Sequence, residues 1–151
     1  LAYVTQTTLS VDEAKGTMNA IKARFPDVLE PQNDDICYAT QNRQDAVKKL
    51  ADEVSLVLVV GSPTSSNSSR LREVAEKRGI TSYLIDSPDE IQEKWFENIE
   101  KVGVTAGASA PEVLVQSVLH KIESLVGKCQ ISQLEGLEER VTFALPKELQ
   151  N

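Results

Sequence analysis

The sequence predicts an α/β fold in which helices cover both faces of a parallel sheet. Short apolar runs that suit strands alternate along the chain with helical patterns. The run at 56–60, LVLVV, is apolar at every position, which is typical of a strand buried on both faces. Such strands belong to parallel sheets, whose right-handed crossovers place helices on both faces. We therefore expect parallel-sheet sandwich lobes.

The N-terminal part predicts a strand, a helix and a linker. The segment LAYVTQT, at 1–7, is strand-like. Apolar residues at helical spacing follow Ser10, which with Glu13 forms a capping box, so we expect a helix over 10–25. The segment 27–35 carries a proline and several acids without periodicity, which indicates a linker and a lobe boundary.

A new unit begins near Ile36 and alternates helices with strands. Thr40 suits the N-cap of its first helix, and Gly79 suits the left-handed C-cap of the next. Beyond Gly127 the alternation ends, and apolar residues alternate over 141–145, which predicts an extended tail. The expected elements are a helix from Thr40, a strand at 56–60, a helix ending at Gly79, a strand at 81–86, a short helix opened by Ser87, a strand at 102–106 and a helix over 111–126.

Composition and charge exclude several classes of protein. The chain has 16 lysines and arginines against 23 aspartates and glutamates, a net charge of −7 without a basic block, which argues against nucleic acid as a partner. No apolar run approaches the roughly 20 residues that cross a bilayer, and no signal peptide opens the chain, so we expect a soluble, cytoplasmic protein without a membrane partner. Cys37 and Cys129 do not form a disulfide framework, and Leu1 in place of methionine suggests a piece of a longer chain.

Small hydroxyl-bearing residues occupy the loops expected at the carboxyl ends of the strands, where ligands bind in open parallel sheets. These loops lie at 7–8, 37–40, 62–68 and 107–109. Free N–H groups at helix N-termini attract anions without needing lysine. A phosphate or diphosphate is the expected ligand.

The stretch GSPTSSNSSR, at 61–70, carries the strongest of these signals. A turn with a helix cap uses one hydroxyl, whereas most side chains of this loop can hydrogen-bond outward, so the excess indicates a bound anion. Neither G-x-x-x-x-G-K-[ST] nor G-x-G-x-x-G occurs, so nucleotide binding is unsupported.

Cys37 and Arg43 leave a different function open. The stretch CYATQNR resembles the phosphate loop of cysteine-dependent phosphatases, although it lacks an internal glycine and has Gln44 where that family has serine or threonine. The alternative is a small buried cysteine with Arg43 on a solvated helix face. The single histidine, His120, lies on the polar face of its helix, so we expect it to be solvated and exclude a histidine-based metal site.

Three longer motifs, DICYATQNRQDAV, VVGSPTSSNSSRLREVA and VGVTAGASAPE, occur in this order. With VTQTTLS near the start and VTFALP in the tail, they resemble the C-terminal part of LytB-type 4-hydroxy-3-methylbut-2-enyl diphosphate reductases. The resemblance implies an oxidoreductase of the methylerythritol phosphate route to isoprenoids, with three α/β lobes around a 4Fe–4S cluster. Its substrate would be a small allylic diphosphate, its products isopentenyl and dimethylallyl diphosphates, and its electron donor a flavodoxin or ferredoxin.

The resemblance also implies roles for individual residues and segments. The other cluster ligands, the diphosphate-binding histidines and the proton-delivering glutamate would lie in the missing N-terminal part of the protein, so this chain alone should be inactive. Two alternatives stay open: a cysteine-dependent phosphatase and a non-catalytic phosphate-binding module. The implied residues are Cys37 as a cluster ligand, Cys129 as structural, Ser65, Ser66, Asn67 and Ser109 as diphosphate-binding, and Thr7, near the substrate hydroxyl and proton path, as catalytic and substrate-binding. The implied segments are half of one lobe at 1–33, a complete lobe at 34–126 and a tail at 127–151.

Overall fold

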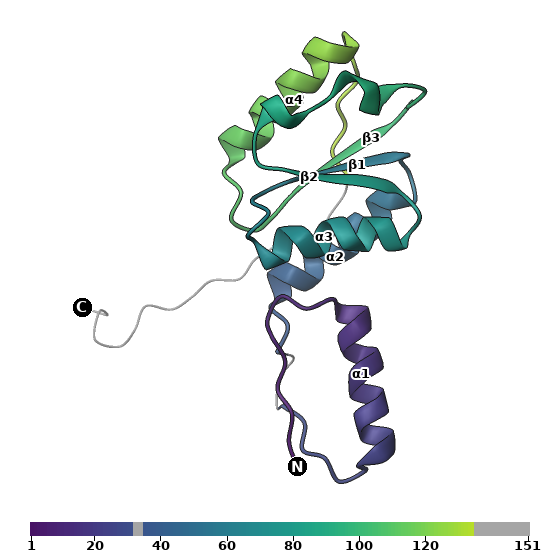
Figure 1. Ribbon diagram of the computed structural model, residues 1–151, viewed down its shortest axis with the longest axis vertical. Coiled ribbons are helices and arrows are strands. Elements are labelled where there is room, and N and C mark those ends of the chain that lie inside the picture. Colours follow the sequence, from purple (N-terminus) through teal and green to yellow (C-terminus); the bar gives the residue numbers. More distant parts are fainter. Residues whose placement is uncertain (32–34, 135–151) are drawn as a thin grey trace, which may run out of the picture.

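A three-stranded parallel sheet lies at the centre of the computed structural model, which describes residues 1–31 and 35–134. Its strand order is β2-β1-β3, and two helices cover one face while a third covers the other (Figure 1). The predicted α/β sandwich is therefore confirmed. The elements are α1 (Val11–Arg24), α2 (Tyr38–Ala51), β1 (Leu56–Val60), α3 (Ser66–Lys77), β2 (Thr81–Ile85), the 3-10 helices η1 (Pro88–Glu90) and η2 (Glu93–Phe96), β3 (Val102–Ala106) and α4 (Glu112–Val126).

The central strand β1 divides the core into two layers. All five of its residues are buried, and successive side chains point to opposite faces of the sheet. On one face, Leu58 and its neighbours two residues away pack with α4. On the other, Val57 and Val59 pack with α2 and α3. An uninterrupted apolar run therefore suits this position, because both faces of the strand are covered.

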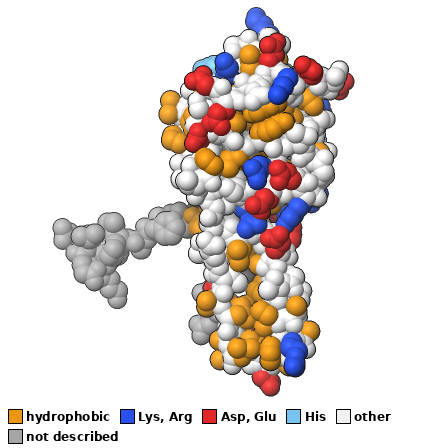
Figure 2. All heavy atoms as spheres, viewed as in Figure 1, with side chains coloured by type: hydrophobic (Ala, Val, Ile, Leu, Met, Phe, Trp, Pro, Cys, Tyr) orange, Lys and Arg blue, Asp and Glu red, His pale blue; other side chains and the backbone are white. Residues whose placement is uncertain are grey.

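The N-terminal unit is built around α1, which confirms the helix predicted there. The expected strand at 1–7 is reduced to a single parallel bridge between Ala2 and Leu29, since no further strand pairs with it among the described residues. Leu1, Val4 and Leu29 are 75%, 83% and 68% exposed. Figure 2 shows hydrophobic side chains gathered at the end of the molecule that α1 and its flanking segments form.

Two predicted caps differ from those observed. The N-cap of α2 is Cys37, not Thr40, because the Cys37 carbonyl already accepts from the Thr40 N–H at 2.9 Å. The Ser10 hydroxyl accepts from the Glu13 N–H at 3.4 Å, but the Glu13 carboxylate bonds to Lys77 and Arg70 instead of completing a capping box.

Other predicted features at the ends of elements are confirmed. Gly79 has φ +79° directly after α3, as a left-handed cap requires. Ser87 and Glu90 form a capping box at η1. The extended segment expected at 141–145 lies outside the described residues. Within residues 1–31 and 35–134, each helix is too short or too polar to cross a membrane.

Candidate functional site at the helix N-termini

The loops that were expected to hold a ligand follow the carboxyl edge of the sheet. The Gly61 N–H donates to the Ile85 carbonyl and the Gly107 N–H donates to the Val60 carbonyl, each at 2.9 Å, so these loops leave the sheet side by side. The connection from α2 to β1 is short, and α2 is about 21 Å long while β1 is about 16 Å long. The N-terminus of α2, at Cys37, therefore points toward the same edge.

The N-terminus of α3 lies directly after the loop that ends β1. Ser65 is the N-cap, and its hydroxyl oxygen accepts from the Ser68 N–H at 3.3 Å. That oxygen can still donate its own proton outward. Ser66, the first residue of the helix, is exposed. The first N–H groups of a helix have no acceptor within it, so this end can bind an anion.

Most of the hydroxyls in the 61–70 loop bond locally, which corrects the expectation that they point outward. The hydroxyls of Ser62 and Thr64 lie 2.9 Å apart, and the Ser69 hydroxyl donates to the Pro63 carbonyl at 3.4 Å. These contacts shape the turn, as local side-chain bonds commonly do. The outward-facing polar groups are therefore fewer than the composition of the loop suggested.

Asn67 is one of two buried side chains of this loop, with Ser68, whose polar atoms have no hydrogen-bond partner. It is only 7% exposed, yet neither its amide nitrogen nor its amide oxygen has a hydrogen-bond partner. A buried amide without partners costs free energy unless a ligand or water satisfies it. A Cβ added to Gly107 would lie 3.8 Å from the Asn67 amide nitrogen, which places Asn67 beside the turn that carries the exposed Ser109. The structure thus brings these predicted residues together.

Cys37 and Thr7 form a second neighbouring pair. The Cys37 N–H donates to the Thr7 carbonyl at 3.0 Å. The Cys37 thiol is exposed and makes no capping hydrogen bond, so the interpretation of a buried cysteine is wrong. Thr7 is also exposed. A free thiol therefore stands at a helix N-terminus beside a free hydroxyl.

The phosphatase alternative does not fit this geometry. In that mechanism the residues between the cysteine and the arginine must wrap around the phosphoryl group. Here Tyr38 to Arg43 are helical, and the N–H groups of Thr40 and Gln41 donate to the Cys37 carbonyl. The Arg43 guanidinium donates to the Ala39 carbonyl of the same helix at 3.1 Å. The N–H groups of Thr40 and Gln41 are thus already used and cannot hold phosphate oxygens.

The remaining candidate residues lie apart from these pairs. His120 is exposed on α4, which confirms the expected solvation, and Cys129 is exposed after α4. Among the residues that the structure describes, no three His, Cys, Asp or Glu side chains are placed to bind one metal ion. A metal centre at Cys37 would therefore need ligands from outside the described residues.

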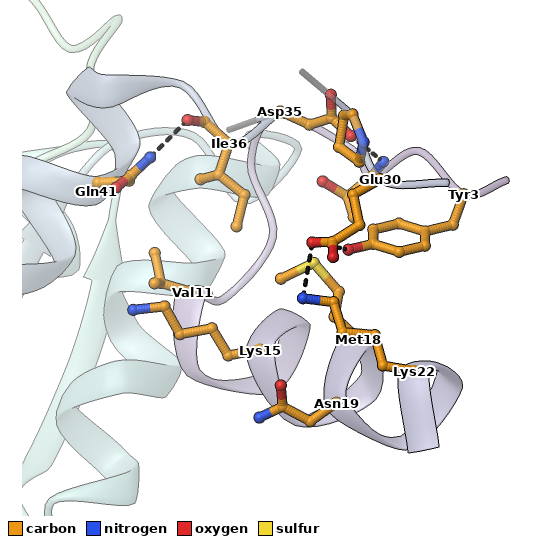
Figure 3. A pocket seen from close by; sticks show the side chains of 12 residues that line it. Tyr3, Val11, Lys15, Met18, Asn19, Lys22, Glu30, Asp35, Ile36 and Gln41 are labelled. Carbon is orange, nitrogen blue, oxygen red and sulfur yellow. Dashed lines mark hydrogen bonds and ion pairs between the residues drawn. The ribbon is translucent and has the colours of Figure 1, made fainter. Parts of the chain in front are cut away.

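A cavity of about 230 Å³ lies between α1 and the segments on either side of it (Figure 3). Two of its charged groups pair with each other: Lys22 and Glu30 lie 2.7 Å apart, and the Tyr3 hydroxyl donates to Glu30 at 3.2 Å. The hydrogen bond from Lys22 lowers the pKa of Glu30, while the Glu30 carboxylate raises the pKa of Lys22. Because none of the predicted site residues lines this cavity, we assign it no ligand.

Comparisons with known proteins agree with this arrangement. Residues 1–123 match the protein family described as LytB protein. The chain is 56% identical over 149 residues to the 4-hydroxy-3-methylbut-2-enyl diphosphate reductase of Pseudomonas fluorescens (strain Pf0-1) and 55% identical to that of Pseudomonas aeruginosa (strain LESB58), covering 99% of this chain and 47% of each relative.

Solved structures show the same likeness in three dimensions. The E-1-hydroxy-2-methyl-but-2-enyl-4-diphosphate reductase from Plasmodium falciparum matches with a TM-score of 0.91 at 32% identity, over 98% of this chain and 47% of that one. The chain thus spans about half the length of the proteins it matches. On the sequence and the fold together, the chain belongs to the LytB protein family.

Proposed function

We propose that this chain is the C-terminal part of a 4-hydroxy-3-methylbut-2-enyl diphosphate reductase. Its relatives carry that name. The N-terminus of α3 offers hydrogen-bond donors for a diphosphate, and the N-terminus of α2 carries the exposed thiol of Cys37. The reaction consumes two electrons and two protons, releases the allylic hydroxyl as water, and leaves isopentenyl or dimethylallyl diphosphate. The observation that carries the proposal is the buried, unpartnered amide of Asn67 at the N-terminus of α3.

The diphosphate would bind at the start of α3. The Asn67 amide nitrogen can donate to a phosphate oxygen, and the hydroxyls of Ser65, Ser66 and Ser109 can donate to others. The helix N-terminus adds a partial positive charge, worth about 0.3–1 kcal/mol for an anion at an exposed site. Neutral donors on a rigid scaffold would thus hold the diphosphate without a lysine in the loop.

Cys37 fits the role of a ligand to a 4Fe–4S cluster. Its thiol is exposed, its backbone is fixed by Thr7, and its side chain has no competing cap. Clusters of this kind are normally held by several cysteine thiolates, so the other ligands would come from the upstream part of the protein. When bound, such a cluster would supply the electrons of the reduction. Thr7, beside Cys37, would hold the substrate hydroxyl and pass it a proton.

The division of the chain follows from this proposal. Residues 1–33 would be half of one lobe, 34–126 a complete lobe, and 127–151 a tail. The exposed apolar residues Leu1, Val4 and Leu29 support an incomplete first lobe. A flavodoxin or ferredoxin would deliver the electrons to the intact protein. The 151 residues alone should not turn over substrate.

Replacing Asn67 tests the proposed diphosphate site. In the full-length protein, Asn67→Ala should weaken binding of 4-hydroxy-3-methylbut-2-enyl diphosphate by about 10- to 150-fold, because hydrogen bonds to charged groups contribute about 1.5–3 kcal/mol each. Ser69→Ala is the matched control, since the Ser69 hydroxyl bonds to the Pro63 carbonyl in the same turn. Affinity unchanged in Asn67→Ala, or lowered equally in both variants, would overturn the assignment. Calorimetric titration measures both.

A further inference from the structure

Gln44 joins the turn after Thr7 to the helix that carries Cys37. Its side chain is fully buried at 0% exposure. Its amide oxygen accepts from the Val11 N–H at 3.0 Å, and its amide nitrogen donates to the Leu9 carbonyl at 2.8 Å. One side chain therefore satisfies two backbone groups of the segment between Thr7 and α1, a segment that belongs to the other unit of the chain.

This contact is one of three described contacts between residues 7–12 and α2 with its cap, and another is the ion pair of Lys48 with Asp12 at 3.0 Å. The third is the hydrogen bond from the Cys37 N–H to the Thr7 carbonyl. Cys37 and Gln44 are seven positions apart, which separates them by about 10.5 Å along a helix axis. A segment bonded at one point can rotate about that bond, but one bonded at two separated points cannot. The orientation of Thr7 relative to Cys37 is thereby fixed.

The contact requires a side chain that both accepts and donates a hydrogen bond, as the Gln44 amide does. Val11 is the first residue of α1, so its N–H has no acceptor within the helix. Leu9 offers a carbonyl, so the bridging group must accept at one end and donate at the other. Glutamate would accept from Val11 but repel the Leu9 carbonyl, and an apolar residue would leave both backbone groups unpaired.

We propose that Gln44 is a positioning residue, which holds Thr7 in register with Cys37 by bridging the two units of the chain. The inference rests on the proposed function, since Thr7 and Cys37 matter together only if both face the same substrate. Misplacement of a reacting group by about 1 Å can cost on the order of a hundredfold in rate. Losing this bridge should therefore affect turnover more than binding of the diphosphate, which other residues hold.

Two variants of the full-length protein test the proposal, Gln44→Met and Gln44→Glu. Both should speed hydrogen exchange of the Cys37 amide at least tenfold, and both should lower kcat by about 10- to 100-fold while KM changes less than about twofold. Glu13→Gln is the matched control, because it removes ion pairs from α1 to Lys77 and Arg70 without touching the Gln44 bridge. It should leave the exchange of the Cys37 amide and kcat unchanged.

Exchange at the Cys37 amide separates this proposal from the proposed function, because that measurement needs neither substrate nor cluster. If the parent protein has no reductase activity but the Gln44 variants exchange the Cys37 amide faster than the parent, the bridge is supported and the reductase is refuted. Unchanged exchange at Cys37 in either folded Gln44 variant would overturn the bridge. If Gln44→Met does not fold, Gln44→Glu carries the test, and if neither folds while Glu13→Gln does, Gln44 is structural and the proposal fails.

Discussion

At the scale of single residues, Ser68 sets how closely the loops after β1 and β3 approach α3. Its hydroxyl is buried without a hydrogen-bond partner. A Cβ added to Gly61 or to Gly107 would overlap the Ser68 hydroxyl, so both positions must lack a side chain. The start of α3 can then pack against the sheet edge. Asn67, the residue before Ser68, owes its place beside Gly107 to this packing.

A methyl group at Gly107 should therefore disturb both stability and binding. Gly107→Ala should lower the free energy of unfolding by about 1–3 kcal/mol, the usual cost of overpacking, and should weaken diphosphate binding because Asn67 shifts. Adding Ser68→Gly should recover part of the loss, despite the cost of about 1 kcal/mol for glycine in a helix. Urea unfolding of the full-length protein measures both effects.

Gly16 offers the matched control for this substitution. It lies inside α1, and a Cβ there would meet nothing within 4 Å, so Gly16→Ala should stabilise the protein by about 0.5–1 kcal/mol. Gly107→Ala with the stability of the parent would contradict the account of this packing, and so would a double variant no better than Gly107→Ala alone.

Part of the candidate site could be predicted from single residues of the sequence. Ser65 and Asn67 lie at a helix N-terminus, where the excess of small polar residues predicted an anion site. Which hydroxyls bond locally could not be predicted, because that depends on the path of the turn. Gln44 had a signal that was missed: it shares a helix stripe with the buried residues Thr40 and Val47, and a polar side chain on a buried stripe must bond to something.

At the scale of elements, Glu13 links α1 to α3. Its carboxylate pairs with Lys77 and with Arg70, which both belong to α3. The hydrogen bond from Lys77 lowers the pKa of Glu13 below its ordinary 4.5, and the charges of Lys77 and Arg70 act in the same direction. The sequence suggested a capping box because Glu13 has the right spacing from Ser10, but a local pattern cannot reveal cations that arrive from a distant helix.

The lowered pKa of Glu13 sets a pH dependence. A carboxylate whose pKa is lower in the folded than in the unfolded state stabilises the fold above the unfolded pKa, and that stabilisation is lost as pH falls through the folded pKa. Glu13→Gln should therefore be less stable than the parent at pH 7, and the difference should vanish as pH falls below 4.5. Urea unfolding from pH 7 to pH 3 measures the difference, and a difference that persists at pH 3 would contradict the assigned pairing.

Most helices and strands of the unit that contains the sheet could be predicted from the hydrophobic periodicity of the sequence and from residues typical of helix ends. The run at β1, the glycine after α3 and the serine before η1 each predicted their element or its end. The sequence placed the N-cap of α2 at Thr40, three residues after the observed cap, Cys37. The Cys37 N–H donates to the carbonyl of Thr7, a residue distant in the sequence, and a local pattern cannot reveal this contact. The prediction of a strand at 1–7 was wrong except for one bridge. A strand forms only where another strand pairs with it, and the local sequence pattern does not show whether such a partner is present.

At the scale of the whole molecule, the chain combines one well-packed unit with one that exposes apolar surface. The sheet is covered on both faces, whereas Leu1, Val4 and Leu29 beside α1 lie largely exposed. The chain also spans about half the length of its relatives. Under the proposed function, an upstream half would complete the first lobe and supply the other cluster ligands. Within the described segments, no three His, Cys, Asp or Glu side chains are placed to hold a metal ion with Cys37.

The most direct test of this account is the iron and acid-labile sulfide content of the full-length protein, purified without oxygen. Cys37→Ser should lose the cluster, while the parent and the control Cys129→Ser should retain it, because only Cys37 lies at the helix N-terminus beside Thr7. A cluster that survives in Cys37→Ser, or a parent protein that contains no iron, would contradict the central claim that Cys37 is a ligand of a reductase cluster.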